Sequence, residues 1–168
     1  MEAVLILTIV TLQRLGELVL ARHNTTRLME TGAWEASPAH YPLLVSLHAG
    51  WLGGLWWLAP GRPVELGFIL AYLAIQPLRV WIIATLGRRW TTRIVIVPDW
   101  PLVRRGPYAV ISHPNYLVVV LEIALLPLAF DLVWYALIFS ALNAAVLHVR
   151  IQAENAALGL PRLVGRES

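Results

Sequence analysis

The last apolar segment of the chain carries polar side chains at helical spacing. Asn143, Leu147, Arg150 and Glu154 recur at steps of four, three and four residues, so in a helix they lie on one face. Arg150 and Glu154 stand one turn apart where the apolar segment ends. This pair is either a surface ion pair that caps a helix or a clamp of two opposite charges for a zwitterionic ligand.

The sequence Ser112-His113-Pro114-Asn115-Tyr116 opens the preceding apolar segment. Proline suits the first position of a helix, where free backbone N–H groups and the positive end of the helix dipole attract a carboxylate. His113 adds a donor, and Tyr116 adds a phenol and a ring one turn along. The alternative is a well-capped helix at a membrane interface with no ligand.

Four ionisable residues fall inside apolar segments, where each costs about 2.5–3.5 kcal/mol unless it has a partner or a function. Arg14 and Glu17 are three residues apart and are expected to neutralise each other as a structural pair. Arg79 and Glu122 lie on different segments. We expect them to form an interhelical pair or to contact a substrate.

Histidine residues in apolar segments raise the possibility of a haem site. His48 and His148 are the pair expected to meet inside a bundle, and interhelical hydrogen bonds are the alternative role for each. No cluster of histidine and acidic residues suggests zinc or iron, so no metal is predicted.

The elements that must position these side chains are membrane helices. Of 168 residues, 58% are hydrophobic and 14% charged, and the mean hydropathy is +0.67, far from soluble globular usage. The composition predicts an all-α integral membrane protein with a single domain over 1–168. Five spans are expected, followed by a tail at 150–168 that contains a short C-terminal helix. The spans are expected at about 2–21, 41–59, 64–86, 114–130 and 132–149.

Charge predicts how the spans are oriented. All 13 basic residues are arginine, and ten of them fall in the 22–40 loop, the 88–113 loop and the tail, against Arg62 on the other side. The positive-inside rule therefore places those loops and the C-terminus in the cytoplasm and the N-terminus outside. A role in nucleic-acid binding is rejected, because in a membrane protein this balance sets topology. Cysteine is absent, which excludes disulfides and thiolate chemistry.

The 88–113 loop is the longest hydrophilic segment. It contains Ile94-Val95-Ile96-Val97 and Leu102-Val103 on either side of Pro98-Asp99-Trp100-Pro101. The pattern predicts either a short hairpin or an ordered loop at the membrane interface.

Three blocks of this sequence resemble the isoprenylcysteine carboxyl methyltransferase family. They are Gly106-Pro107-Tyr108, His113-Pro114-Asn115-Tyr116, and Arg150-Ile151 with Glu154, and the lead-in from Arg79-Val80-Trp81 to Trp90-Thr91 is also similar. The resemblance covers about residues 76–158. The chain is further similar to a bacterial branch that O-methylates alkylpyrones and is associated with type III polyketide synthases. Gln13-Arg14-Leu15-Gly16-Glu17 and His40-Tyr41-Pro42 carry this finer match.

The resemblance implies an enzyme that binds S-adenosylmethionine on the cytoplasmic side of a bacterial inner membrane. It implies a lipophilic acceptor, a prenylcysteine-like carboxylate or an alkylpyrone hydroxyl, that enters from the bilayer. Arg150 would hold the acceptor and Glu154 the cofactor's ammonium, as the catalytic pair, while Arg79 and Glu122 would also contact the acceptor. The residues implied to bind the cofactor are Trp100, Leu102, Val103, Tyr108, His113, Pro114, Asn115, Tyr116 and Glu154.

The chain departs from the family at the cofactor's carboxylate. Ser112 stands where the family commonly has Arg or Lys, so Arg104 or Arg105 is expected to supply the cation. Methyl transfer to an ionised oxygen needs alignment more than a base, which fits a chain without a catalytic dyad. Two other functions compete with this one. They are a membrane reductase of the sterol type that uses NADPH, and a haem-binding or scaffolding bundle without enzymatic activity.

Overall fold

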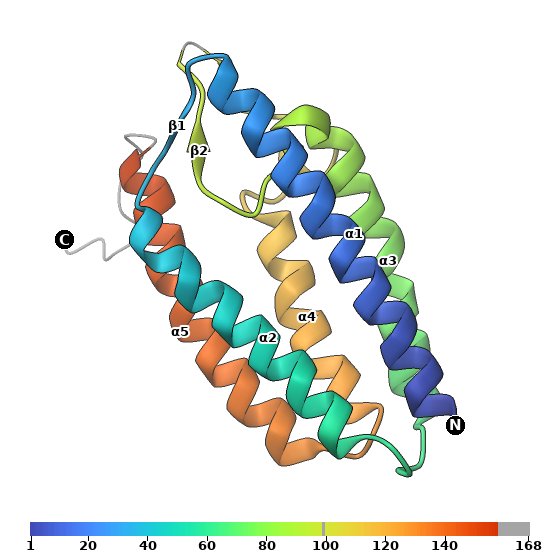
Figure 1. Cartoon of the computed structure of the whole chain (residues 1–168). Helices are drawn as coiled ribbons and strands as arrows, with labels where there is room; N and C mark the ends of the chain where they lie inside the picture. The colour runs from blue at the N-terminus through green and yellow to red at the C-terminus, as the bar shows by residue number, and fades with distance from the viewer. Residues whose placement is uncertain (99, 158–168) are drawn as a thin grey trace, which may run out of the picture.

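The computed structural model describes residues 1–98 and 100–157 as a bundle of long helices (Figure 1). The helices are α1 (Glu2–Glu30), α2 (Tyr41–Leu58), α3 (Leu66–Leu86), α4 (Pro114–Leu128) and α5 (Val133–Ala157). Two short strands and three 3₁₀ turns complete it: β1 (Trp34–Glu35), β2 (Val95–Ile96), η1 (Pro38–His40), η2 (Gly87–Arg89) and η3 (Gly106–Ala109). We call the end that holds β1, β2, η2, η3, the start of α4 and the end of α5 the loop end.

The predicted apolar segments all form helices, and two boundaries differ from expectation. α1 continues nine residues past the predicted end at 21, through a polar stretch that contributes the buried Asn24 to the packing. α5 runs unbroken to Ala157, eight residues past the predicted end of the span at 149, so the described part of the tail continues α5 and is not a separate helix. The rest of the predicted tail, 158–168, lies outside them.

Membrane crossing is supported by the length and composition of three helices. In the described part of the chain these are Glu2–Glu30, Leu66–Arg89 and Val133–Ala157. The chain is therefore an all-α membrane protein. α4 has 15 residues, fewer than the roughly 20 that a span needs, so crossing by α2 and α4 remains a prediction.

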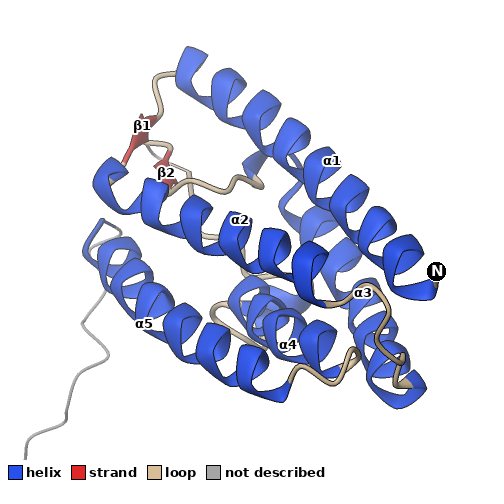
Figure 2. Ribbon diagram, turned by 60° about the horizontal axis from the view of Figure 1, so that its bottom comes forward, coloured by secondary structure: helices blue, strands red, loops and turns tan. Residues whose placement is uncertain are grey.

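The helices are packed tightly at one end and carry cavities at the other. α4 lies between α3 and α5, and α2 runs beside α5 in both views (Figures 1 and 2). The main cluster of buried hydrophobic residues, which includes Leu7, Leu55 and Phe130, gathers at the end opposite the loops. The loop end is thus the part of the bundle with room for ligands.

The predicted hairpin of the last two helices is confirmed, with Asp131 in the turn. Asp131 has φ +54°, a left-handed conformation that Asp tolerates better than most residues. The N–H of Leu132 donates to Pro127 O and that of Asp131 to Leu128 O, both at 3.0 Å, which is a Schellman motif. Because proline has no backbone N–H, Pro127 cannot donate the helical hydrogen bond to Ile123 O. Trp51 Nε1 on α2 donates to that carbonyl instead, at 3.3 Å.

Gly54 allows α2 to approach α5 closely. A Cβ at this position would lie 2.2 Å from the hydroxyl of Tyr135. That hydroxyl donates to the carbonyls of Gly50 and Trp51, at 3.1 and 2.8 Å. Gly54 is therefore required for this close helix contact, whereas added Cβ atoms at Gly50 and Gly53 would meet nothing within 4 Å.

The 88–113 loop does not form the predicted hairpin. Its strand β2 pairs antiparallel with β1 from the 31–40 connection, with Trp34 opposite Ile96 and Glu35 opposite Val95. The alternative interpretation, an ordered loop, is the one that agrees with the structure. The hairpin prediction failed because the pairing partner lies some 60 residues away and is only two residues long, too short for a periodicity signal.

Candidate functional site

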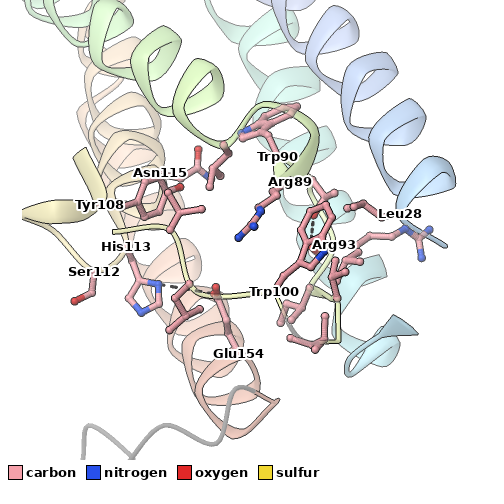
Figure 3. Close-up of a pocket in the computed structure, with 18 of the residues that line it drawn as sticks. Leu28, Arg89, Trp90, Arg93, Trp100, Tyr108, Ser112, His113, Asn115 and Glu154 are labelled. Carbon is pink, nitrogen blue, oxygen red and sulfur yellow. Dashed lines mark hydrogen bonds and ion pairs between the residues drawn. The ribbon is translucent and has the colours of Figure 1, made fainter. Parts of the chain in front are cut away.

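A cavity of about 610 Å³ opens at the loop end, within the range of cofactor sites (Figure 3). The 88–113 loop, the start of α4 and the end of α5 form most of its wall. We call it the loop cavity. Its lining includes Arg89, Trp90, Arg93, Trp100, Leu102, Val103, Arg104, Tyr108, Ser112, His113, Asn115, Tyr116, Arg150 and Glu154.

A second cavity of about 320 Å³ lies among all five helices, deeper in the bundle. We call it the helix cavity. Most of its wall is apolar, but the charged residues of the membrane segments also reach it. Its lining includes Leu15, Leu18, Leu44, Val45, Leu52, Val119, Ile123 and Leu147, together with Arg14, Glu17, His48, Arg79 and Glu122.

The two cavities are adjacent and share part of their walls. Trp90, Thr91, Asn115, Tyr116 and Arg150 line both of them. Three of these five residues hold buried polar atoms without a hydrogen-bond partner among the described residues: Trp90 Nε1, Asn115 Oδ1 and Arg150 Nη1. Buried polar groups are normally paired, so this junction has the chemistry of a site whose partners come with a ligand.

The charged clamp, by which we mean Arg150 and Glu154, is joined through a phenol. Arg150 Nε donates to Tyr116 Oη at 2.9 Å, and the Tyr116 hydroxyl donates to Glu154 Oε2. Arg150 is 6% exposed and makes no ion pair within 4 Å in the described chain. A buried guanidinium with only a neutral partner is suited to bind an anion.

The start of α4 forms as predicted. His113 is the N-cap and Pro114 the first helical residue. The His113 ring stacks on Tyr116 with centroids 5.1 Å apart, and its Nδ1 lies 3.8 Å from Glu154 Oε2. The helix N-terminus and both signs of charge therefore converge on one wall of the loop cavity.

The opposite wall carries arginine and aromatic residues (Figure 3). The Arg89 guanidinium lies 4.4 Å above the centre of the Trp100 ring, and its Nη1 donates to Pro101 O at 2.5 Å. Arg93 pairs with Glu35 at 2.6 Å. Tyr108 lies on the same side of the cavity as His113 (Figure 3). Burial, with a smaller contribution from the nearby Glu154 carboxylate, raises the pKa of the Tyr108 phenol above its usual range, so this ring stays neutral.

The expected ion pairs of the membrane segments merge into one network. Arg14–Glu17 lies at 2.9 Å and Arg79–Glu122 at 2.7 Å, as predicted, but Arg14 also reaches Glu122 at 2.8 Å and Arg79 reaches Glu17 at 2.5 Å. We call these four residues the charge network. It balances two positive and two negative charges across α1, α3 and α4, and it borders the helix cavity.

The structure brings together nearly all the residues predicted for the site. Of the predicted cofactor residues, Pro114 is buried in the helix start and does not line the loop cavity. Arg79 and Glu122 line the helix cavity, as do the predicted cofactor residues Asn115 and Tyr116. Of the two candidate cations, Arg104 lines the loop cavity and Arg105 does not.

Sequence reasoning missed Arg89, Trp90 and Arg93 as site residues. They follow α3 and reach the cavity because the backbone of Trp90 is fixed from α1, where Asn24 Nδ2 donates to its carbonyl at 2.8 Å. A buried asparagine far away in sequence gives no signal for such a contact. The suspected haem pair bonds locally instead: His48 Nδ1 lies 2.9 Å from Leu44 O, and His148 Nε2 lies 2.7 Å from Gln152 Nε2.

One comparison with known proteins identifies a family. The model of the isoprenylcysteine carboxyl methyltransferase family matches residues 67–159. The chain is also 36% identical over 167 residues to the uncharacterized protein YpbQ of Bacillus subtilis (strain 168), a match that covers 92% of this chain and 95% of that protein. No solved structure matches.

Proposed function

This chain belongs to the isoprenylcysteine carboxyl methyltransferase family, whose members are methyltransferases, and from that premise we propose that it transfers a methyl group from S-adenosylmethionine to an oxygen of a lipophilic acceptor. The observation that carries the proposal is the junction of the two cavities at Tyr116 and Arg150. A donor held in one cavity and an acceptor held in the other would meet there.

The residues of the loop cavity fit S-adenosylmethionine. Glu154 offers a carboxylate for the ammonium of the methionine end, and the N-terminus of α4 with His113 offers donors for its carboxylate. Arg104 is a further cation that lines the loop cavity. Trp100, held by Arg89, and Tyr108 offer flat apolar surfaces for the adenine ring.

The residues of the helix cavity fit a lipophilic acceptor. Its wall is largely aliphatic, and the helices around it face lipid with many exposed apolar side chains, such as Leu15 at 53% and Leu43 at 53%. A prenylcysteine-like carboxylate and an alkylpyrone hydroxyl both combine an apolar chain with an acidic oxygen. Arg150 would bind that ionised oxygen at the junction.

The chemistry asks little of the protein beyond placement. When bound, S-adenosylmethionine supplies an electrophilic methyl group: the acceptor oxygen bonds to the methyl carbon, and the carbon–sulfur electron pair stays on the neutral sulfide. An acceptor that is already ionised needs no general base. Arg150 and Glu154 would align the acceptor oxygen with the methyl group, and the Tyr116 hydroxyl, which is hydrogen-bonded to both side chains, would hold their relative positions.

We also place the loop end on the cytoplasmic side of a bacterial inner membrane, with the N-terminus outside. The arginine residues of the loops and of the end of α5 support this orientation. In this arrangement the water-soluble donor reaches the loop cavity from the cytosol, while the acceptor enters the helix cavity from the bilayer.

Calorimetry on the detergent-purified protein tests the proposal. We expect micromolar binding of S-adenosylhomocysteine and no binding of NADPH, which would separate a methyltransferase from a reductase. Glu154→Gln should weaken S-adenosylhomocysteine at least tenfold, because it removes the charge that faces the ammonium. Gln152→Ala, a change at an exposed residue of the same helix, should leave binding unchanged. A folded wild-type protein that binds NADPH and not S-adenosylhomocysteine would refute the proposal.

Transfer itself is tested with labelled S-adenosylmethionine and lipid extracts. Arg150→Gln should abolish labelling of the lipid product but should leave binding of S-adenosylhomocysteine within about twofold, because Arg150 serves the acceptor. Loss of S-adenosylhomocysteine binding in this variant would show that Arg150 contacts the cofactor. It would contradict the proposal that one cavity holds the cofactor and the other the acceptor.

A further inference from the structure

Trp90 is a buried tryptophan at the junction whose role no family block explains. Its side chain is 3% exposed, and its Nε1 has no hydrogen-bond partner among the described residues. The residue lines both the loop cavity and the helix cavity. A buried indole N–H normally has a partner, so packing alone does not account for this one.

The backbone holds Trp90 in place from two helices. Its N–H donates to Gly87 O at 3.1 Å at the end of α3, and its carbonyl accepts from Asn24 Nδ2 of α1 at 2.8 Å. Asn24 Nδ2 also lies 3.2 Å from Gly87 O. The indole is thus placed by a rigid frame rather than by a free loop, as a binding group should be.

We infer that the indole N–H of Trp90 is the second donor of an oxyanion site whose first donor is Nη1 of Arg150. This inference rests on the proposed function and deepens it. Both atoms are buried donors without partners, and both residues belong to the five shared by the two cavities. One charged and one neutral N–H donor suit an anion whose negative charge is delocalised over two oxygens. A carboxylate and the enolate of a 1,3-dicarbonyl ring are such anions.

The acceptor, not the cofactor, is the partner of this donor pair. The sulfonium and the ammonium of S-adenosylmethionine are cations and accept no hydrogen bond. Its carboxylate is assigned to the start of α4 and its adenine ring to Trp100 and Tyr108. His113, Trp100 and Tyr108 line the loop cavity but not the helix cavity. Figure 3 shows Trp90 and Asn115 along one edge of the cavity, with His113 and Glu154 away from them. The third unpaired atom, Asn115 Oδ1, is an acceptor and is left for a donor on either ligand.

Binding of acids and of their methyl esters tests the inference without any methyl transfer. We would use two pairs of probes in lipid nanodiscs: dodecanoate with methyl dodecanoate, and N-acetyl-S-farnesylcysteine with its methyl ester. The wild type should bind at least one acid about tenfold or more tightly than its ester, because only the acid offers an oxyanion. Equal affinity within both pairs would overturn the inference.

Trp90→Phe keeps a ring and removes the N–H. It should lower the preference for the acid about 10- to 100-fold, the usual effect of one hydrogen bond to a charged group, with ester affinity unchanged. Trp90→His restores a ring N–H and should recover part of the preference. Trp81→Phe, at a tryptophan that is 55% exposed and lines neither cavity, is the matched control.

The outcomes separate this inference from the proposed function. Absence of S-adenosylhomocysteine binding in the wild type would refute the methyltransferase, even if the acid preference persists. An unchanged acid preference in Trp90→Phe, or an equal loss of acid and ester affinity in both Trp90 variants, would overturn only the role of Trp90. Weaker S-adenosylhomocysteine binding in Trp90→Phe would assign the indole to the cofactor's carboxylate and also overturn it.

Discussion

Replacing Glu122 by glutamine should destabilise the bundle severely. Glu122 is 1% exposed and accepts from Arg14 Nη2 at 2.8 Å, Arg79 Nη1 at 2.7 Å and Gln76 Nε2 at 3.0 Å. The substitution keeps the shape but leaves two buried guanidiniums with one carboxylate. Breaking a buried ion pair from one side costs about 3–5 kcal/mol, since the remaining charge has no partner.

Thermal unfolding in detergent measures this cost. For a chain of this size, 1 kcal/mol corresponds to about 2–4 °C in Tm, so Glu122→Gln should lower Tm by about 6–20 °C. Glu65→Gln is the matched control, because the side chain that it changes is exposed at the start of α3 and should shift stability by at most about 0.5 kcal/mol.

The expected destabilisation comes from the loss of charge balance in the network rather than from the loss of a single contact, and a double variant separates the two. Adding Arg79→Gln to Glu122→Gln leaves the pair Arg14–Glu17, which is neutral and 2.9 Å apart. The double variant should therefore be less destabilised than the sum of the two single variants, by about 0.5–3 kcal/mol. A Tm of Glu122→Gln within 2 °C of the wild type, or strictly additive effects, would refute this reasoning.

Three further variants probe the site and the packing. Tyr116→Phe removes the hydroxyl that joins the charged clamp and should lower kcat/KM about tenfold or more, measured with labelled donor; an unchanged value would show that the clamp needs no bridge. Gly54→Ala places a Cβ against the Tyr135 hydroxyl and should lower the free energy of unfolding by about 1–3 kcal/mol, measured by thermal unfolding. Gly53→Ala is the control, because its Cβ meets no atom within 4 Å and should not lower that free energy. Because the pKa of Tyr108 is raised, the folded state keeps the phenol proton at a pH where the unfolded chain has lost it, so the free energy of unfolding should fall as pH rises above about 10. Tyr108→Phe should reduce this fall, measured as Tm against pH. A Tm of Tyr108→Phe that declines with pH as steeply as that of the wild type would contradict the prediction.

Local patterns predicted the elements of the bundle well. Every predicted apolar segment became a helix, although α1 and α5 extend past the predicted ends. Asp131 alone was enough to predict the hairpin of α4 and α5, because two helices joined by such a short turn must run antiparallel. The start of α4 at Pro114 followed from the preference of proline for that position. Each of these features is set by residues close together in sequence.

Most contacts between distant segments could not be predicted from the sequence. The pairing of β1 with β2 joins two-residue strands from different loops, and Asn24 reaches the carbonyl of Trp90 across the bundle. The charge network was predicted as two separate pairs, since spacing reveals Arg14 with Glu17 but not that Glu122 accepts from both arginines. Trp90 went unassigned for the same reason: a tryptophan near a membrane interface looks like an anchor until its burial is known.

The placement of charge is consistent with the proposal that one small bundle binds a charged cofactor and an apolar acceptor. The charge network is neutral and nearly fully paired, so the helix cavity that it borders presents no net charge to an oily molecule. Arg150 is the exception, a buried cation without an anion within 4 Å in the described chain, and it stands where the two cavities meet. An acceptor that carries its single negative charge at one end would gain that ion pair only when its acidic oxygen reaches the junction. In the proposed function, the same buried charge that is costly in the empty bundle would therefore select both the chemical class of the acceptor and the orientation in which it binds.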